Sequence, residues 1–204
     1  MEQHPHVSAA IDKLSRDRIR IADAPTVVPQ RPGLYAIYGS DSVWEVLGVT
    51  STFEHGPLYV GKSENNLLVR EVFTHFNASA TRKPSTGSST VRRSFAALLR
   101  AELHLRAQPR NPAKPADFAS YGLAGNGDFL LTSWMADNLK LAVWEDPEMP
   151  ELSLGEVETV LIRLWDPPIN IDKAPTPRRD LKTRRALLAK EARESARAEL
   201  IASP

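Results

Sequence analysis

The sequence predicts a mixed α/β fold in which short strands alternate with amphipathic helices. Three observations carry this prediction. Short runs rich in β-branched and aromatic residues recur along the chain, segments with helical periodicity separate them, and proline, glycine and serine clusters mark the breaks. The 204 residues, 42% of them hydrophobic, are enough for one ordinary domain with a real core.

The first half of the chain predicts strands that follow a short helix. Residues 7–21 have the apolar and charged spacing of an amphipathic helix. Three prolines then break the chain, and residues 33–38 follow as a strand, with 43–49 as a further strand or part of a hairpin. Residues 58–61 are expected to form a second short strand, and the apolar spacing after it indicates a helix to about residue 76.

The second half of the chain is predicted to be mainly helical. A serine- and glycine-rich loop precedes a helix expected at 90–105, which Ser88 or Ser89 caps and which the following prolines end. A further helix, a third strand and two more helices are expected at 128–138, 139–144, 153–165 and from residue 178 onward.

Composition excludes several classes of function. The chain has no cysteine, so disulfides, thiolate zinc sites and cysteine nucleophiles are excluded, and a bound metal must use oxygen or imidazole ligands. That ligand chemistry suits hard ions such as Mg²⁺. Since no apolar run is long enough to span a bilayer and no secretory signal is evident, a cytoplasmic protein without membrane contact is the default expectation.

One glutamate of the late helix is predicted to face the core. Ser153 and Glu156 match the capping box S-x-x-E, in which both side chains satisfy backbone donors at the helix start. At about 100° per residue, Glu158 instead falls within the apolar arc, between Leu154 and Ile162. A carboxylate there is costly unless it forms a salt bridge, for example with a nearby arginine, or binds a metal. The helix alone leaves both alternatives open.

Six motif elements occur in a set order along the chain. They are Gly33-Leu34-Tyr35, Tyr59-Val60-Gly61-Lys62, Arg70, His75, Glu158 and Pro167-Pro168-Ile169-Asn170. This order resembles the GIY-YIG nuclease superfamily over about residues 32–171. The resemblance implies an α+β fold with a small central antiparallel sheet of three strands flanked by helices, and it places the two motif tyrosines on neighbouring strands.

The resemblance also implies an activity, the metal-dependent hydrolysis of DNA phosphodiester bonds by an endonuclease. Glu158 would bind one divalent ion, Mg²⁺ or Mn²⁺, that contacts the scissile phosphate and stabilises the leaving oxygen. Arg70 would hold the non-bridging oxygens as a fixed cation. His75 follows Arg70 by five residues rather than four, so the two side chains do not share a helix face, and a solvated or core-edge histidine is favoured.

The remaining motif residues would act on the attacking water. Tyr35 and Tyr59 would converge on it, and one of them would serve as general base. Because a phenol is a poor base at its ordinary pKa, Lys62 is the candidate cation that lowers the pKa. Asn170 would orient a tyrosine hydroxyl. Taken singly, the tyrosines could be ordinary strand aromatics and Asn170 the cap of a turn.

Basic residues cluster where DNA could be held. Arg92 and Arg93 fall in the first turn of a predicted helix, where the helix dipole disfavours cations, so a DNA phosphate is the expected compensating anion. The alternative is that both reach into water or pair with local acids. The stretch from Arg178 to Arg185 is also basic, with a solvated helix as the alternative.

The chain is expected to have three parts. Residues 1–29 form a helical arm, 30–173 a GIY-YIG-like nuclease domain and 174–204 a basic helical tail. DNA is the expected partner, and a second copy of the chain is a further candidate. The alternative function is a non-catalytic nucleic-acid-binding module that retains the fold.

Overall fold

The computed structural model describes residues 4–50, 53, 55–68, 86–111, 120–147 and 152–202, and the chain divides into two units. Unit 1 comprises Met1–Phe73 and Met135–Arg178, and unit 2 comprises Thr74–Trp134 and Arg179–Pro204. This division differs from the three predicted parts, because strand pairing returns the chain to unit 1 after residue 135.

A four-stranded sheet lies at the centre of unit 1. Its strands are antiparallel, in the order β1-β6-β2-β3, and they span Ile19–Arg20 (β1), Gly33–Gly39 (β2), Tyr59–Ser63 (β3) and Leu139–Glu145 (β6). The three predicted central strands are confirmed. The sheet has one more strand than expected, because β1 is too short to show an alternating pattern in the sequence.

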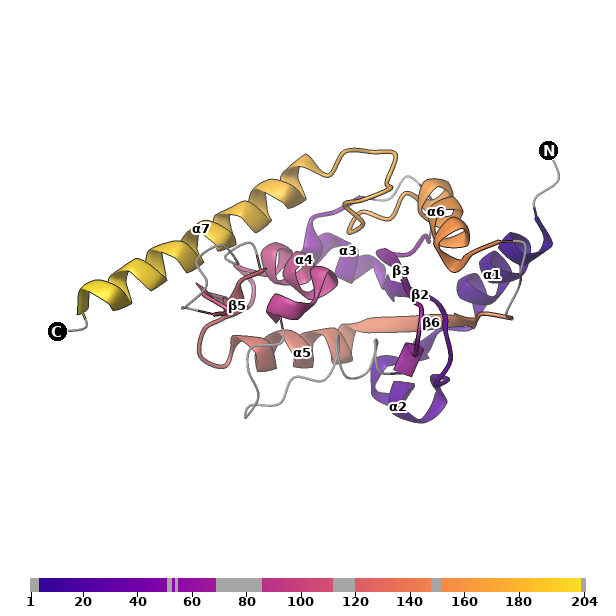
Figure 1. Ribbon diagram of the computed structural model, residues 1–204, viewed down its shortest axis with the longest axis horizontal. Helices are drawn as coiled ribbons and strands as arrows, with labels where there is room; N and C mark the ends of the chain where they lie inside the picture. Colours follow the sequence, from indigo (N-terminus) through magenta and orange to yellow (C-terminus); the bar gives the residue numbers. More distant parts are fainter. Residues whose placement is uncertain are drawn as a thin grey trace. The chain divides into compact units, whose positions relative to one another are not determined.

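Two helices cover one face of this sheet. Helix α1 (Pro5–Arg16) and helix α6 (Leu154–Trp165) lie side by side in Figure 1 and share a hydrophobic core with the strands. The buried core residues include Leu14, Leu34, Ala36, Val60, Leu161 and Trp165. Because side chains alternate along a strand, Leu34 and Ala36 point to the α6 side of β2, and their neighbour Tyr35 points to the other side.

The prediction of a strand within 43–49 is wrong. Residues Asp41–Leu47 form helix α3, which follows Ser40 at the N-cap position and ends at Gly48, a glycine in the left-handed conformation (φ 61°). Val43 and Leu47 are both buried, as the spacing of four residues on one helix face requires. Between β1 and β2, a 3-10 turn η1 (Ile21–Asp23) leads into the short helix α2 (Ala24–Val27).

Unit 2 is mainly helical. Its elements are η3 (Thr86–Ser88), α4 (Thr90–Leu98), β4 (Ala107–Gln108), β5 (Gly122–Leu123), the first part of α5 (Gly127–Asn138) and α7 (Arg179–Ala202). The Ser89 hydroxyl caps α4, as predicted, by accepting from the Arg92 backbone nitrogen at 3.1 Å. Helix α4 ends before residue 105; the turns after it include the left-handed His104 (φ 50°). No described helix is long and apolar enough to cross a membrane.

Candidate active site

The two motif tyrosines contact each other on one face of the sheet. Tyr35 lies opposite Gly61 and Tyr59 lies opposite Ile37 in the antiparallel pairing of β2 with β3. The ring centroids of Tyr35 and Tyr59 are 5.9 Å apart and the rings are tilted by 36°. Tyr35 is fully buried, whereas Tyr59 is half-buried. The prediction that the tyrosines lie on neighbouring strands is confirmed.

Gly61 provides the space in which the tyrosine rings meet. A Cβ atom on Gly61 would lie 2.5 Å from Cζ and the hydroxyl oxygen of Tyr35, and 2.8 Å from Cε1 of Tyr59. Contacts this short do not occur between real atoms, so a side chain here must displace a ring. The glycine therefore allows close approach within a strand and does not mark a tight turn.

Gly61→Ala is expected to lower the free energy of unfolding by about 1–3 kcal/mol, because the added methyl group overpacks a buried ring. Chemical denaturation measures this change. The matched control is Gly155→Ala in α6, where the nearest atom to an added Cβ is the flexible end of Lys62 at 3.3 Å. That control should be neutral or stabilising, since alanine favours helix. A Gly61→Ala variant as stable as the wild type would show that the rings do not meet here.

Lys62 lies on the opposite face of the sheet from the tyrosines. Lys62 on β3 lies opposite Leu34 on β2. Because side chains alternate between the faces of a strand, both side chains point to the face of the sheet that α6 covers. The Lys62 ammonium nitrogen is close to Gly155 on α6 and forms an ion pair with Glu64. This geometry does not fit the predicted role of Lys62 as the cation that lowers a tyrosine pKa.

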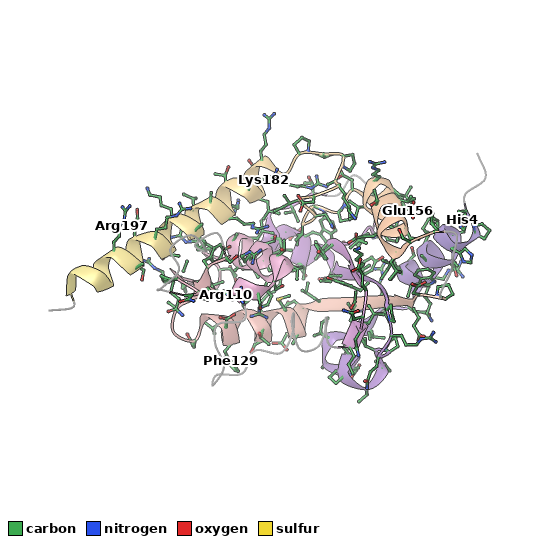
Figure 2. All side chains as sticks on the ribbon, viewed as in Figure 1. His4, Arg110, Phe129, Glu156, Lys182 and Arg197 are labelled. Carbon is green, nitrogen blue, oxygen red and sulfur yellow. The ribbon has the colours of Figure 1, made fainter. Side chains whose placement is uncertain are left out.

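Glu158 occupies the core-facing side of α6, as the helical wheel predicts. Its exposed fraction is 9%, whereas Glu156, labelled in Figure 2, is exposed and completes the capping box with Ser153. The Glu158 Oε2 atom accepts from the Lys173 ammonium at 2.6 Å. Of the two alternatives that the helix left open, the salt bridge is present, with a lysine in place of the arginine.

Asn170 binds the backbone of β3. Its Oδ1 accepts from the Val60 nitrogen at 2.9 Å, and its Nδ2 donates to the Val60 carbonyl at 2.8 Å. The side chain thus pairs with the edge of the sheet between Tyr59 and Gly61. The predicted hydrogen bond from Asn170 to a tyrosine hydroxyl stays a prediction. Asn170 positions the strand that carries Tyr59.

The segment after the double proline connects β3 to α6. The Ile169 nitrogen donates to the Leu58 carbonyl at 3.0 Å, next to the Asn170 contacts, and Lys173 then reaches Glu158. Arg178 holds the start of the segment by donating to the carbonyl oxygens of Asp166 and Pro167 at 2.8 and 3.0 Å. Arg178 is therefore a partly buried anchor within unit 1, not part of an exposed basic tail.

Arg92 is built into the interior of unit 2. It is fully buried, and its guanidinium group donates to the Asp128 carboxylate at 3.0 Å, the Asp128 carbonyl at 3.1 Å and the Thr132 hydroxyl at 3.0 Å. Burial lowers the pKa of Arg92, and the charge and hydrogen bond of Asp128 oppose that shift. The predicted contact of Arg92 with a DNA phosphate does not fit this environment. The acid that offsets its charge is local.

Arg93 lies at the edge of a group of positive charges in unit 2. It is half-buried and donates to the Gly87 carbonyl at 2.7 Å, an oxygen that Arg110 also reaches at 3.3 Å. Burial lowers the pKa of Arg93, and the nearby guanidinium groups of Arg185 and Arg110 lower it further. Arg70 and His75 lie outside the described residues.

Glu158 offers one carboxylate to a metal ion. No group of three or more histidine or acidic side chains that could hold a metal occurs among the residues described. An ion at Glu158 would therefore keep mostly water ligands, as Mg²⁺ prefers. The carboxylate is paired with the Lys173 ammonium, and an ion at Glu158 would have to displace this contact.

One of the comparisons with known proteins identifies a family for the chain. No curated protein and no solved structure matches the chain. The family model described as the GIY-YIG catalytic domain matches residues 33–194, a range that contains the tyrosine pair, Glu158 and Asn170. This match covers most of the 204 residues. The chain therefore belongs to the GIY-YIG catalytic domain family.

Proposed function

We propose that the chain is a metal-dependent endonuclease that hydrolyses phosphodiester bonds of DNA. The observation that carries the proposal is the physical linkage of the motif residues in unit 1. The tyrosine pair lies on β2 and β3, Asn170 binds β3 beside Tyr59, and the same loop brings Lys173 to Glu158. Strand pairing and a ring contact join the tyrosines, and one loop contacts both β3 and Glu158; in a chain of a nuclease family, this arrangement supports catalysis over a purely structural role.

Each motif residue has a role in the proposed reaction. Glu158 would hold one divalent ion, Mg²⁺ or Mn²⁺, which supplies charge neutralisation at the phosphate and the leaving oxygen when bound. Tyr35 and Tyr59 would orient the attacking water, and one of them would accept its proton. Lys62, on the α6 side of the sheet, would bind a phosphate oxygen rather than activate a phenol. From its place in the family motif, Arg70 is proposed as a second phosphate ligand.

Unit 2 offers a basic surface that suits the DNA backbone. Neither Arg93 nor Arg110 forms an ion pair within the described part of the chain, and both lie within electrostatic range of each other. Helix α7 adds exposed cations, among them Lys182, which is labelled in Figure 2. Like charges gathered in this way favour an anionic partner, and the DNA contact proposed for unit 2 therefore involves Arg93, Arg110 and α7.

Tyr35→Phe and Tyr59→Phe are each expected to reduce nicking of supercoiled plasmid in Mg²⁺ by about 10²–10⁴-fold, because the hydroxyl that orients or deprotonates the water is lost. The matched control is Tyr38→Phe on the same strand. Tyr38 points to the other face and donates to the Leu14 carbonyl at 2.9 Å, and burial, opposed by Arg18, raises its pKa to about 12. This control should lose some stability and keep its activity.

The same assay separates the nuclease from the alternative function. DNA binding without cleavage in Mg²⁺ or Mn²⁺, with no effect of either tyrosine substitution on binding, would indicate a non-catalytic module that retains the fold. Equal cleavage by the two variants and the wild type would remove the tyrosines from the mechanism.

A further inference from the structure

Lys173 is a feature of the site that the family motif does not contain. Its ammonium nitrogen lies 2.6 Å from Glu158 Oε2 and 3.5 Å from the Gly155 carbonyl oxygen. The side chain of Glu158 is 11% exposed and that of Lys173 is 38% exposed. The lysine side chain is therefore partly in solvent, and its ammonium group contacts a nearly buried carboxylate at the position proposed for the metal.

The backbone of Lys173 adopts a conformation that is unusual for lysine. Its φ angle is +65°, in the left-handed region that glycine and asparagine adopt more readily than other residues. A lysine in this conformation pays a steric cost that the surrounding structure must offset. The contact with Glu158 supplies a physical reason, because a nearly buried carboxylate without a partner is strongly unfavourable.

The lysine and a divalent ion compete for the same carboxylate. Both are cations, and each reduces the affinity of Glu158 for the other through direct repulsion at short range. Lysine carries its charge on a flexible stem with three rotatable donors, and more than a third of this side chain is exposed. The ammonium can therefore leave Glu158 and return to water without a change in the fold.

We infer that Lys173 is the built-in counter-ion of Glu158, which pairs with the carboxylate in the metal-free protein and is displaced when the divalent ion binds. Lys173 thereby sets the metal affinity of the site. This inference rests on the proposed role of Glu158 as metal ligand, and it adds a residue that controls how much metal the enzyme needs.

The test is titration calorimetry of the full-length protein with Mn²⁺, in the absence of DNA. Lys173→Met removes the charge and keeps the length of the side chain, and it should tighten Mn²⁺ binding by about tenfold (~1.4 kcal/mol). Lys173→Arg keeps the charge and should bind Mn²⁺ within a factor of about two of the wild type. Lys140→Met, an exposed lysine on β6, is the matched control and should leave the affinity unchanged.

A second readout excludes a purely structural role. Without metal, Lys173→Met should have a lower thermal midpoint than the wild type, because Glu158 loses its counter-ion. Saturating Mn²⁺ should raise the midpoint of Lys173→Met more than that of the wild type, since a ligand that binds the folded state more tightly stabilises it more. A lysine with only a packing role would lower both midpoints equally.

Glu158→Gln separates the failure of this inference from the failure of the proposed function. If Glu158→Gln abolishes Mn²⁺ binding while Lys173→Met binds Mn²⁺ as the wild type does or more weakly, the metal site stands and the inference is overturned. If Glu158→Gln binds Mn²⁺ as tightly as the wild type, the ion does not use Glu158, and both proposals fall.

Discussion

Arg92→Met is expected to lower the free energy of unfolding by about 3–5 kcal/mol, the range for a buried ion pair that loses one partner. Arg92 is fully buried, with 0% of its surface exposed to solvent. Its substitution leaves Asp128 without the guanidinium group that binds both its carboxylate and its carbonyl. The Thr132 hydroxyl loses a donor as well. Urea denaturation followed by circular dichroism measures the change.

Arg110→Met is the matched control for Arg92→Met. Arg110 is exposed, and its described contact is one long hydrogen bond of 3.3 Å to the Gly87 carbonyl. This variant should unfold at nearly the wild-type urea concentration and should bind duplex DNA more weakly, with a shallower dependence of affinity on salt. If Arg92→Met were stable and weakened DNA binding as much as Arg110→Met, the original prediction of a phosphate contact at Arg92 would be right after all.

Glu158→Gln is expected to reduce the single-turnover rate of DNA cleavage by about a thousandfold (~4 kcal/mol), because the proposed reaction loses the ligand of its ion. Glutamine has nearly the same shape and should leave the fold and the affinity for DNA intact. The rate is measured with enzyme in excess over a labelled duplex, and the affinity is measured separately by fluorescence anisotropy in Ca²⁺.

Glu156→Gln is the control for Glu158→Gln at a distance of two residues. Glu156 is exposed and serves the capping box, in which hydrogen bonds from the Ser153 hydroxyl and backbone lower the pKa of the glutamate. Its substitution should cost a little helix stability and leave cleavage unchanged. Equal losses of cleavage in the two variants would indicate that α6 as a whole, rather than the carboxylate of Glu158, supports the reaction.

Features that depend on local periodicity could be predicted from the sequence. The buried side of α6, the capping box at Ser153 and the central strands that carry Tyr35 and Tyr59 each follow from residue spacing within one element. The direction of Lys62 was predictable too, because a residue next to Gly61 in a strand must point away from the face that Gly61 shares with the tyrosines.

Contacts between distant segments could not be predicted. Lys173 meets Glu158 from a loop, and Asn170 binds Val60 across 110 positions of sequence. The burial of Arg92 likewise depends on Asp128, which reaches it from another helix. A helix wheel places Glu158 on the inner face, but only the fold shows which cation meets it there. The sequence did not distinguish helix α3 from a strand. The spacing of Val43 and Leu47 fits a helix, but the apolar residues around them also fit a strand.

The central claim is that Glu158 and a divalent ion together cut DNA. Its most direct test is the conversion of supercoiled plasmid to open circles by the purified chain, with wild type and Glu158→Gln assayed in parallel in Mg²⁺ and in EDTA. Only the wild type in Mg²⁺ is expected to nick the plasmid. Nicking by Glu158→Gln at the wild-type rate, or undiminished nicking by the wild type in EDTA, would contradict it.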